Sequence, residues 1–81
     1  MAILEGATMI KVTWVDATLY AGWHSDWETE PLVNESVGFL IEENESAVVI
    51  ALSKNRYKIG DYLVIPRSSI VEQVYIQEAQ Q

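Results

Sequence analysis

Apolar and polar residues alternate along the segment "MIKVTWVD", which begins at Met9. Ile10, Val12 and Trp14 fall on one side of an extended chain, and Lys11 falls on the other. A period of two residues is typical of a strand with one buried face. We therefore expect a strand here, with Trp14 among the core residues.

Two further apolar segments predict a hairpin. "SVGFLIEE" at 36–43 alternates with the same period, and "SAVVIALS" at 46–53 is a β-branched run too short for a typical helix. The polar "ENES" between them favours a tight turn. Residues 36–53 are therefore expected to form an antiparallel hairpin.

The C-terminal part of the chain predicts two more strands. A polar loop is expected at 53–61, followed by the strand "YLVI" at 62–65. Pro66 ends this strand because it cannot donate a ladder hydrogen bond. "PRSS" favours one helical turn, and "IVEQVYI" at 70–76 is expected to be the last strand.

The segment 17–35 lacks this alternation and is long for a connection in so short a chain. Ser25 and Glu28 have the spacing of a capping box, which predicts a short helix near 26–32. Pro31 limits that helix to a turn or two.

These elements predict an all-β fold: a small, strongly bent, five-stranded antiparallel barrel of the SH3-like or Sm-like kind, with a minor helical turn. The stretch "IPRSSI" resembles the corresponding element of those barrels. The chain of 81 residues is expected to form a single domain, 1–81. Its ordered core is expected at about 8–76, with the tail 77–81 frayed.

Composition limits the chemistry. The chain has no cysteine and a single histidine, His24, which excludes disulfides, thiolate metal sites and multi-histidine sites. We expect no metal and no cofactor. Because a chain this short often needs added stabilisation, we predict a homo-oligomer.

The charge is unevenly distributed. Residues 1–53 carry nine acidic residues against Lys11, whereas residues 54–81 carry four basic residues against three acidic ones. The net charge of −7 disfavours general nucleic-acid binding. The four cations could clamp a phosphate or pair with acidic residues of the same chain or a neighbouring subunit; they are Lys54, Arg56, Lys58 and Arg67.

No membrane segment is expected. "MAILEGATMI" at the start is interrupted by Glu5 and Gly6, which argues against a signal peptide. The longest apolar run, "AVVIAL" at 47–52, is far below the length that spans a bilayer. We therefore expect a soluble, intracellular protein.

Two tryptophans of the long segment are candidates for a binding site. Trp23 and Trp27 could stack on a nucleotide-like ligand or could cover an open end of the barrel. Asp16 shares the face of Trp14. It could cap the following loop through backbone N–H groups or the Trp23 indole, or accept a hydrogen bond from a ligand.

No catalytic constellation is visible, and we predict that the protein is not an enzyme. His24 has only Ser25 and Asp26 beside it, and adjacent residues rarely converge into a triad. A lone histidine in this position is more often a surface or capping residue. The acidic tip of the hairpin, with Glu42, Glu43 and Glu45, is expected to be a solvated surface.

Four segments of the chain carry a resemblance to known sequences: "VTWVDA", "GWHS", "SVGFLIEENESAVVIAL" and "GDYLVIPRSSI". In their order and spacing they resemble a family of small, mostly uncharacterised bacteriophage and prophage proteins. The resemblance covers roughly residues 10–72. The chain departs from the family at Ala17, where a serine is usual, and in its extended tail at 73–81. The resemblance implies a viral protein of unknown activity that is present in the host cytoplasm.

We therefore hypothesise a phage-encoded, non-enzymatic binding protein that acts in counter-defence and sequesters a small anionic, nucleotide-like ligand or binds a host protein. The alternative is a structural or assembly module that acts through homo-oligomerisation. The candidate ligand-binding residues are Asp16, Trp23, His24, Trp27, Lys54, Arg56 and Arg67.

Overall fold

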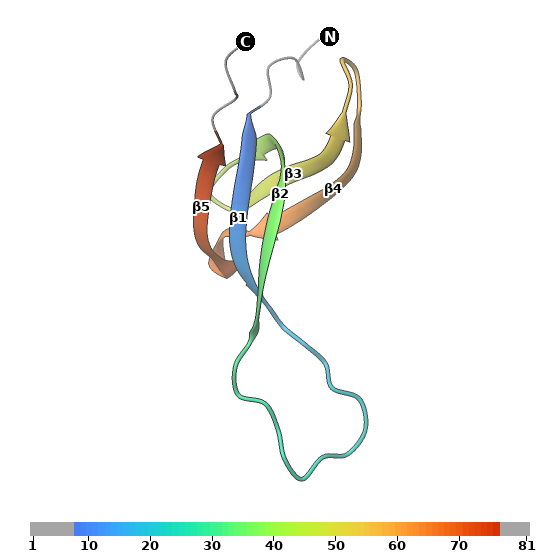
Figure 1. Cartoon of the computed structure of the whole chain (residues 1–81), viewed down its shortest axis with the longest axis vertical. Helices are drawn as coiled ribbons and strands as arrows, with labels where there is room; N and C mark the ends of the chain where they lie inside the picture. Colours follow the sequence, from blue (N-terminus) through green and yellow to red (C-terminus); the bar gives the residue numbers. More distant parts are fainter. Residues whose placement is uncertain (1–7, 77–81) are drawn as a thin grey trace.

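The computed structural model describes residues 8–76, which form a single antiparallel sheet and one short 3-10 turn (Figure 1). The strand order in the sheet is β4-β3-β2-β1-β5, and every neighbouring pair is antiparallel. The prediction of an all-β fold with five antiparallel strands is confirmed. The elements are β1 (Met9–Asp16), β2 (Leu32–Glu43), β3 (Ala47–Lys54), β4 (Ile59–Pro66), η1 (Arg67–Ser69) and β5 (Ile70–Ile76).

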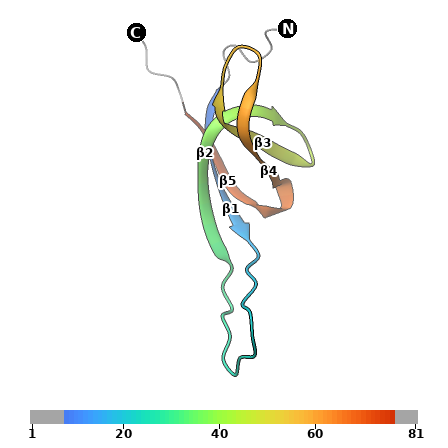
Figure 2. The same ribbon diagram turned by 90° about the vertical axis from the view of Figure 1, so that its right-hand side faces the viewer.

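The long strand β2 bends the sheet, because it pairs with a different neighbour along each part of its length (Figure 2). Its first part pairs with β1 and its last part with β3, and the register with β3 shifts between Leu40 and Glu42. Such irregularities bend a strand and increase its twist. Gly38 lies just before this bend, and a Cβ atom added there would lie 2.7 Å from the backbone oxygen of Ala51. Only glycine allows β3 to approach β2 this closely.

The core lies on the concave face of the bent sheet. Its fully or almost fully buried members come from β1, β3 and β4, and Trp14, Leu40 and Ile70 pack against them. The indole Nε1 of Trp14 donates a hydrogen bond to Ser36 Oγ on β2 at 3.0 Å. The predicted core position of Trp14 is confirmed. The buried cluster consists of Ile10, Val12, Val48, Ile50 and Ile65.

The two edge strands are β4 and β5, and no strand pairing joins them among residues 8–76. The described sheet is therefore open, and closure into a barrel is not seen. Polar side chains instead connect β5 to the end of β2. The Tyr75 hydroxyl donates to the Glu43 carboxylate at 2.6 Å, and Arg67 Nη2 lies 3.3 Å from the same carboxylate. Gln73 joins both, accepting from Arg67 and donating to Glu43.

Several element boundaries differ from those predicted. Strand β2 begins at Leu32, and β4 begins at Ile59 within the expected polar loop. The helix predicted near 26–32 is wrong, because the chain there forms bends and then enters β2. An isolated turn of helix is costly to nucleate, and every residue of 17–31 is exposed, so no packed face stabilises one.

Two sequence-based predictions concern residues outside the described range. The argument against a signal peptide rests partly on residues 1–7, and the expected fraying concerns 77–81. Among residues 8–76, no helix is long and apolar enough to cross a membrane.

Candidate functional site

The connection between β1 and β2, residues 17–31, is the most exposed part of the described chain, and we call it the aromatic loop. It extends away from the sheet in both views (Figures 1 and 2). Trp23 is fully exposed and Trp27 is 79% exposed. Gly22 has a φ of +93°, in the region that favours glycine. The two tryptophans therefore do not cover the sheet, which leaves them available to a partner.

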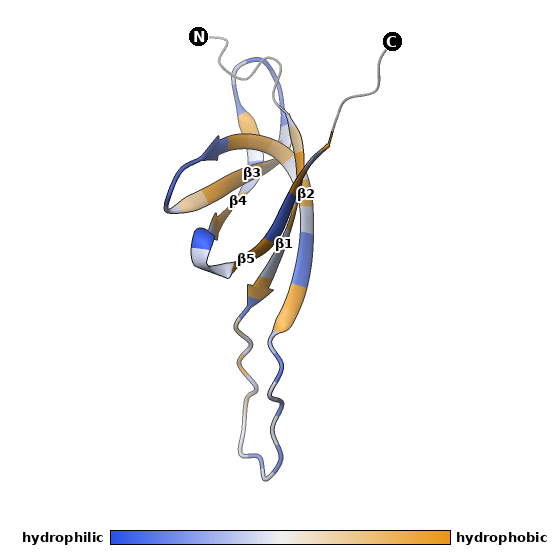
Figure 3. Cartoon of the chain, turned by 90° about the vertical axis from the view of Figure 1, so that its left-hand side faces the viewer, coloured by the Kyte–Doolittle hydropathy of each residue, from blue (hydrophilic) through white to orange (hydrophobic). Residues whose placement is uncertain are grey.

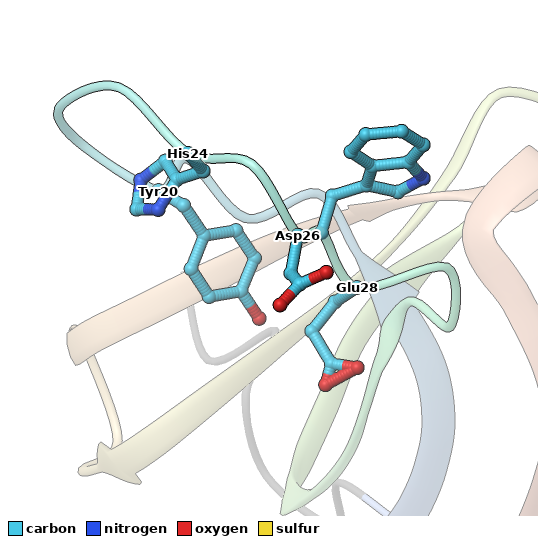
Figure 4. Close-up of a pocket in the computed structure, with 5 residues that line it drawn as sticks. Tyr20, His24, Asp26 and Glu28 are labelled. Carbon is cyan, nitrogen blue, oxygen red and sulfur yellow. The ribbon is translucent and has the colours of Figure 1, made fainter.

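A hollow of about 460 Å³ lies on the aromatic loop. Figure 4 shows the Tyr20 hydroxyl and the carboxylates of Asp26 and Glu28 directed to the same side of the loop. Trp27 and His24 complete the lining. Because the charged lining groups are carboxylates, the hollow repels anions and suits a cationic or hydrogen-bond-donating group beside an apolar one.

His24 supports the loop's own conformation. Its Nε2 atom lies 2.7 Å from the backbone oxygen of Ala21. A carbonyl oxygen can only accept, so Nε2 carries the proton in this contact. The expectation of a surface or capping histidine is confirmed.

Asp16 lies at the end of β1 and is exposed. The expectation of an inward carboxylate is therefore wrong, because β1 leaves the core at this point. The Trp23 indole is itself fully exposed and does not cover Asp16. Asp16 instead borders a second, smaller hollow on the aromatic loop, together with Glu28 and Glu30.

The predicted cations do not join the tryptophans in one site. Lys54 ends β3, and Arg56 follows it in the turn to β4. This turn lies at the opposite end of the described molecule from the aromatic loop (Figure 1). Within a single chain, these cations and the tryptophans therefore cannot line one small binding site together. The Lys54 ammonium also lies 5.4 Å from the centre of the Phe39 ring.

Arg67 is held by hydrogen bonds and an ion pair within the fold. Its Nε donates to the backbone oxygen of Asn44 at 2.8 Å, and its guanidinium also contacts Gln73 and Glu43. These bonds occupy much of the fork that would hold a phosphate. Arg67 therefore ties η1 to the β2–β3 turn.

The polar cluster around Glu43 was missed by sequence reasoning. The hydrogen bond from Tyr75 is the main cause that lowers the pKa of Glu43, and Arg67 and Gln73 act in the same direction. The same hydrogen bond raises the pKa of Tyr75. Gln73 and Tyr75 pair with Val12 and Ile10, so they lie on the core face of β5. The sequence carries no signal for this placement, because simple alternation groups Ile70, Val74 and Ile76 on the opposite face of the strand and makes that face the more apolar one.

Hydrophobic residues are frequent along the strands of the sheet (orange in Figure 3), and many of their side chains are exposed. In the described residues, sixteen large hydrophobic side chains are exposed and only six hydrophobic residues are buried. The radius of gyration is 16.0 Å, against about 12 Å for a compact chain of this length. A single chain therefore leaves apolar surface open to a macromolecular partner.

Comparison of the chain with protein-family models, with curated proteins and with solved structures found no match.

Proposed function

We propose that this protein is a non-enzymatic protein-binding module whose contact element is the aromatic loop. The observation that carries this proposal is the exposure of Trp23 and Trp27 on a loop that extends away from the sheet. Tryptophan is enriched among the residues that dominate binding energy at protein interfaces. The acidic lining of Asp26 and Glu28 favours a partner surface that is basic and partly apolar.

The sequence suggested either a small anionic ligand or a host protein as the partner, and the charge of the loop favours the protein. A small anion would meet two carboxylates in the hollow of the loop, so the loop favours a protein over a nucleotide. In keeping with the resemblance to phage proteins, we propose a host protein as the partner and counter-defence as the role. We propose a cytoplasmic location for the same reason.

A labelled peptide provides a direct test. Two peptides of equal length would alternate leucine with lysine or leucine with glutamate, and fluorescence anisotropy would measure their binding. We expect the lysine peptide to bind and the glutamate peptide not to bind. Trp23→Ala/Trp27→Ala should weaken binding roughly tenfold or more. The matched control is Val71→Ala/Val74→Ala on β5, which removes exposed apolar residues elsewhere and should leave binding unchanged.

The three cations of the β3–β4 turn favour a second candidate, the binding of a small anion. Lys54, Arg56 and Lys58 lie within five consecutive residues that contain no acid. A nucleotide that raises the melting temperature, with the shift lost in Lys54→Ala/Lys58→Ala, would establish this function. Combined with no binding of the lysine peptide, that result would overturn the protein-binding proposal.

We also propose that the sheet has the SH3-like or Sm-like arrangement. The supporting observations are the strand order, the 3-10 turn between β4 and β5, and the side-chain bonds from β5 to Glu43. A solution structure in which β4 and β5 stay apart at every point would contradict it.

A further inference from the structure

The two ends of the described molecule carry opposite charge. The aromatic loop contains Asp26, Glu28 and Glu30 and no lysine or arginine. The turn at 54–58, which we call the basic tip, contains three cations and no acid. These regions lie at opposite ends of a molecule about 55 Å long, so they cannot meet within one chain (Figures 1 and 2).

The basic tip adjoins a mostly apolar hollow that is lined by residues of β2, β3 and β4. This hollow opens because β3 pairs with β2 only as far as Ala51, and β2 then follows β1 instead. Its volume is about 320 Å³, within the range of roughly 300–1,000 Å³ in which proteins hold small apolar groups. Leu52 and Tyr62 line it and are 70% and 62% exposed, and Leu63 also contributes. The lining also includes the carboxylate of Asp61, which lies beyond the three cations of the basic tip in the sequence.

We propose that the aromatic loop of one copy binds the basic tip and the adjoining hollow of a second copy. The inference rests on the proposed function, because it names a partner for the same loop. The indoles of Trp23 and Trp27 enter the hollow, and the carboxylates of Asp26, Glu28 and Glu30 face the cations of the basic tip. The contact thereby pairs apolar surface with apolar surface and the acidic side chains of one copy with the cations of the other.

Charge complementarity identifies the occupant as a second copy. Each chain has a net charge of −7, so two copies repel one another in most orientations. The approach of a basic tip to an aromatic loop brings opposite charges together and is the orientation that this repulsion opposes least. A reciprocal antiparallel dimer and a head-to-tail series both use this one contact.

Mixing two variants tests the contact. Trp23→Ala/Trp27→Ala removes the loop surface and keeps the tip, whereas Lys54→Glu/Lys58→Glu removes the tip and keeps the loop. By sedimentation velocity, we expect the wild type to associate, and each variant alone to associate roughly tenfold more weakly or worse. An equimolar mixture should form a one-to-one dimer, because one intact loop meets one intact tip. Circular dichroism confirms that each variant is folded.

Two controls separate this contact from other modes of association. Val71→Ala/Val74→Ala should associate as the wild type does. Raising the salt concentration from about 0.05 M to about 0.5 M should weaken wild-type association, because the contact pairs exposed charges. A mixture that remains monomeric, or association that is lost only in the β5 variant, would overturn the inference.

The outcome also separates this inference from the proposed function. A wild type that stays monomeric but binds the lysine peptide through Trp23 and Trp27 leaves the loop as a protein-binding element and removes the second copy as its partner. A wild type that binds neither a second copy nor the peptide overturns both.

Discussion

Strand β1 and the aromatic loop are consecutive in the chain and are both rich in large apolar residues, yet one is packed and the other is exposed. Ile10 and Val12 on β1 are completely buried, whereas Trp23 is completely exposed. The two regions differ in their periodicity. In β1, the alternation of an extended strand directs every second side chain to the core, and the loop has no such repeat. Apolar content alone therefore does not decide burial. Apolar residues that lie outside a regular alternating pattern remain exposed and available to another molecule.

The largest expected effect comes from shortening one apolar side chain in each region to alanine, which tests whether β1 is packed and the aromatic loop is not. Ile10→Ala should lower the free energy of unfolding by about 3 kcal/mol, because it leaves a cavity in a small core. Trp23→Ala should change it by less than about 0.5 kcal/mol. Urea denaturation at low protein concentration measures both. Equal losses would mean that the loop packs on the sheet.

A second comparison concerns two glycines of the sheet. Gly38→Ala should destabilise the protein by about 1–3 kcal/mol, because the new Cβ meets the backbone of β3 and overpacks it. Gly60→Ala is the matched control: its Cβ would lie 2.8 Å from Ser53 Oγ, a side-chain atom that can move. Thermal melts of both variants should show the larger shift for Gly38→Ala. The reverse order would contradict the packing at the bend of β2.

Replacing the aromatic loop with a two-residue Asn-Gly turn separates folding from binding. Asp16 and Leu32 are paired, so such a turn joins β1 and β2 in register. We expect stability to rise by about 1 kcal/mol, because a shorter loop is less costly to close. Association and peptide binding should both be lost. A shortened protein that is unfolded by circular dichroism would show that the loop is needed for the sheet.

The smallest expected effect is on the pH dependence of stability. The lowered pKa of Glu43 means that its bonds to Tyr75 and Arg67 stabilise the fold at neutral pH. This contribution is lost as the pH falls through the folded-state pKa, below the ordinary range of a glutamate. Glu43→Gln should therefore be less stable than the wild type at neutral pH and should lose less stability on acidification. Urea denaturation at several pH values measures both proteins. Unfolding free energies that change with pH in parallel would contradict this prediction.

The contribution of Tyr75 has the opposite sign. Its raised pKa means that the protonated hydroxyl is stabilised by the bond to Glu43, and this contribution is lost as the pH rises through the folded-state value. Tyr75→Phe should therefore reduce the loss of unfolding free energy that the wild type shows at alkaline pH. The packing of the buried core should remain largely unchanged.

The strands could be predicted because their signal is local. Strand β1 and strand β5 have the predicted bounds, and the hairpin of β2 and β3 differs mainly at its ends. The start of β2 was missed because "LVNE" at 32–35 owes its extended conformation to pairing with β1, a contact distant in sequence. The failed helix near 26–32 has the same origin: a capping box describes a helix start but supplies no surface for packing.

The candidate site was harder to predict than the fold. Residue type singled out Trp23, Trp27, Lys54 and Arg56 as candidates, but only the folded structure shows that the tryptophans and these two cations lie at opposite ends of the molecule. The role of Arg67 depends on the bend that brings Glu43 to β5, and no local pattern encodes that bend. The pairing of β5 with β1 places Gln73 and Tyr75 on the core face, whereas the sequence alone favours the opposite face, with Ile70, Val74 and Ile76.

Hydrogen–deuterium exchange at two protein concentrations tests the central claim most directly, since it measures the aromatic loop and β1 in the same sample. At low concentration, amides of residues 17–31 should exchange near the unprotected rate, while those of β1 remain protected. At high concentration, the loop and the basic tip should gain protection together. Loop amides that are as protected as those of β1 at the lowest concentration would contradict the account.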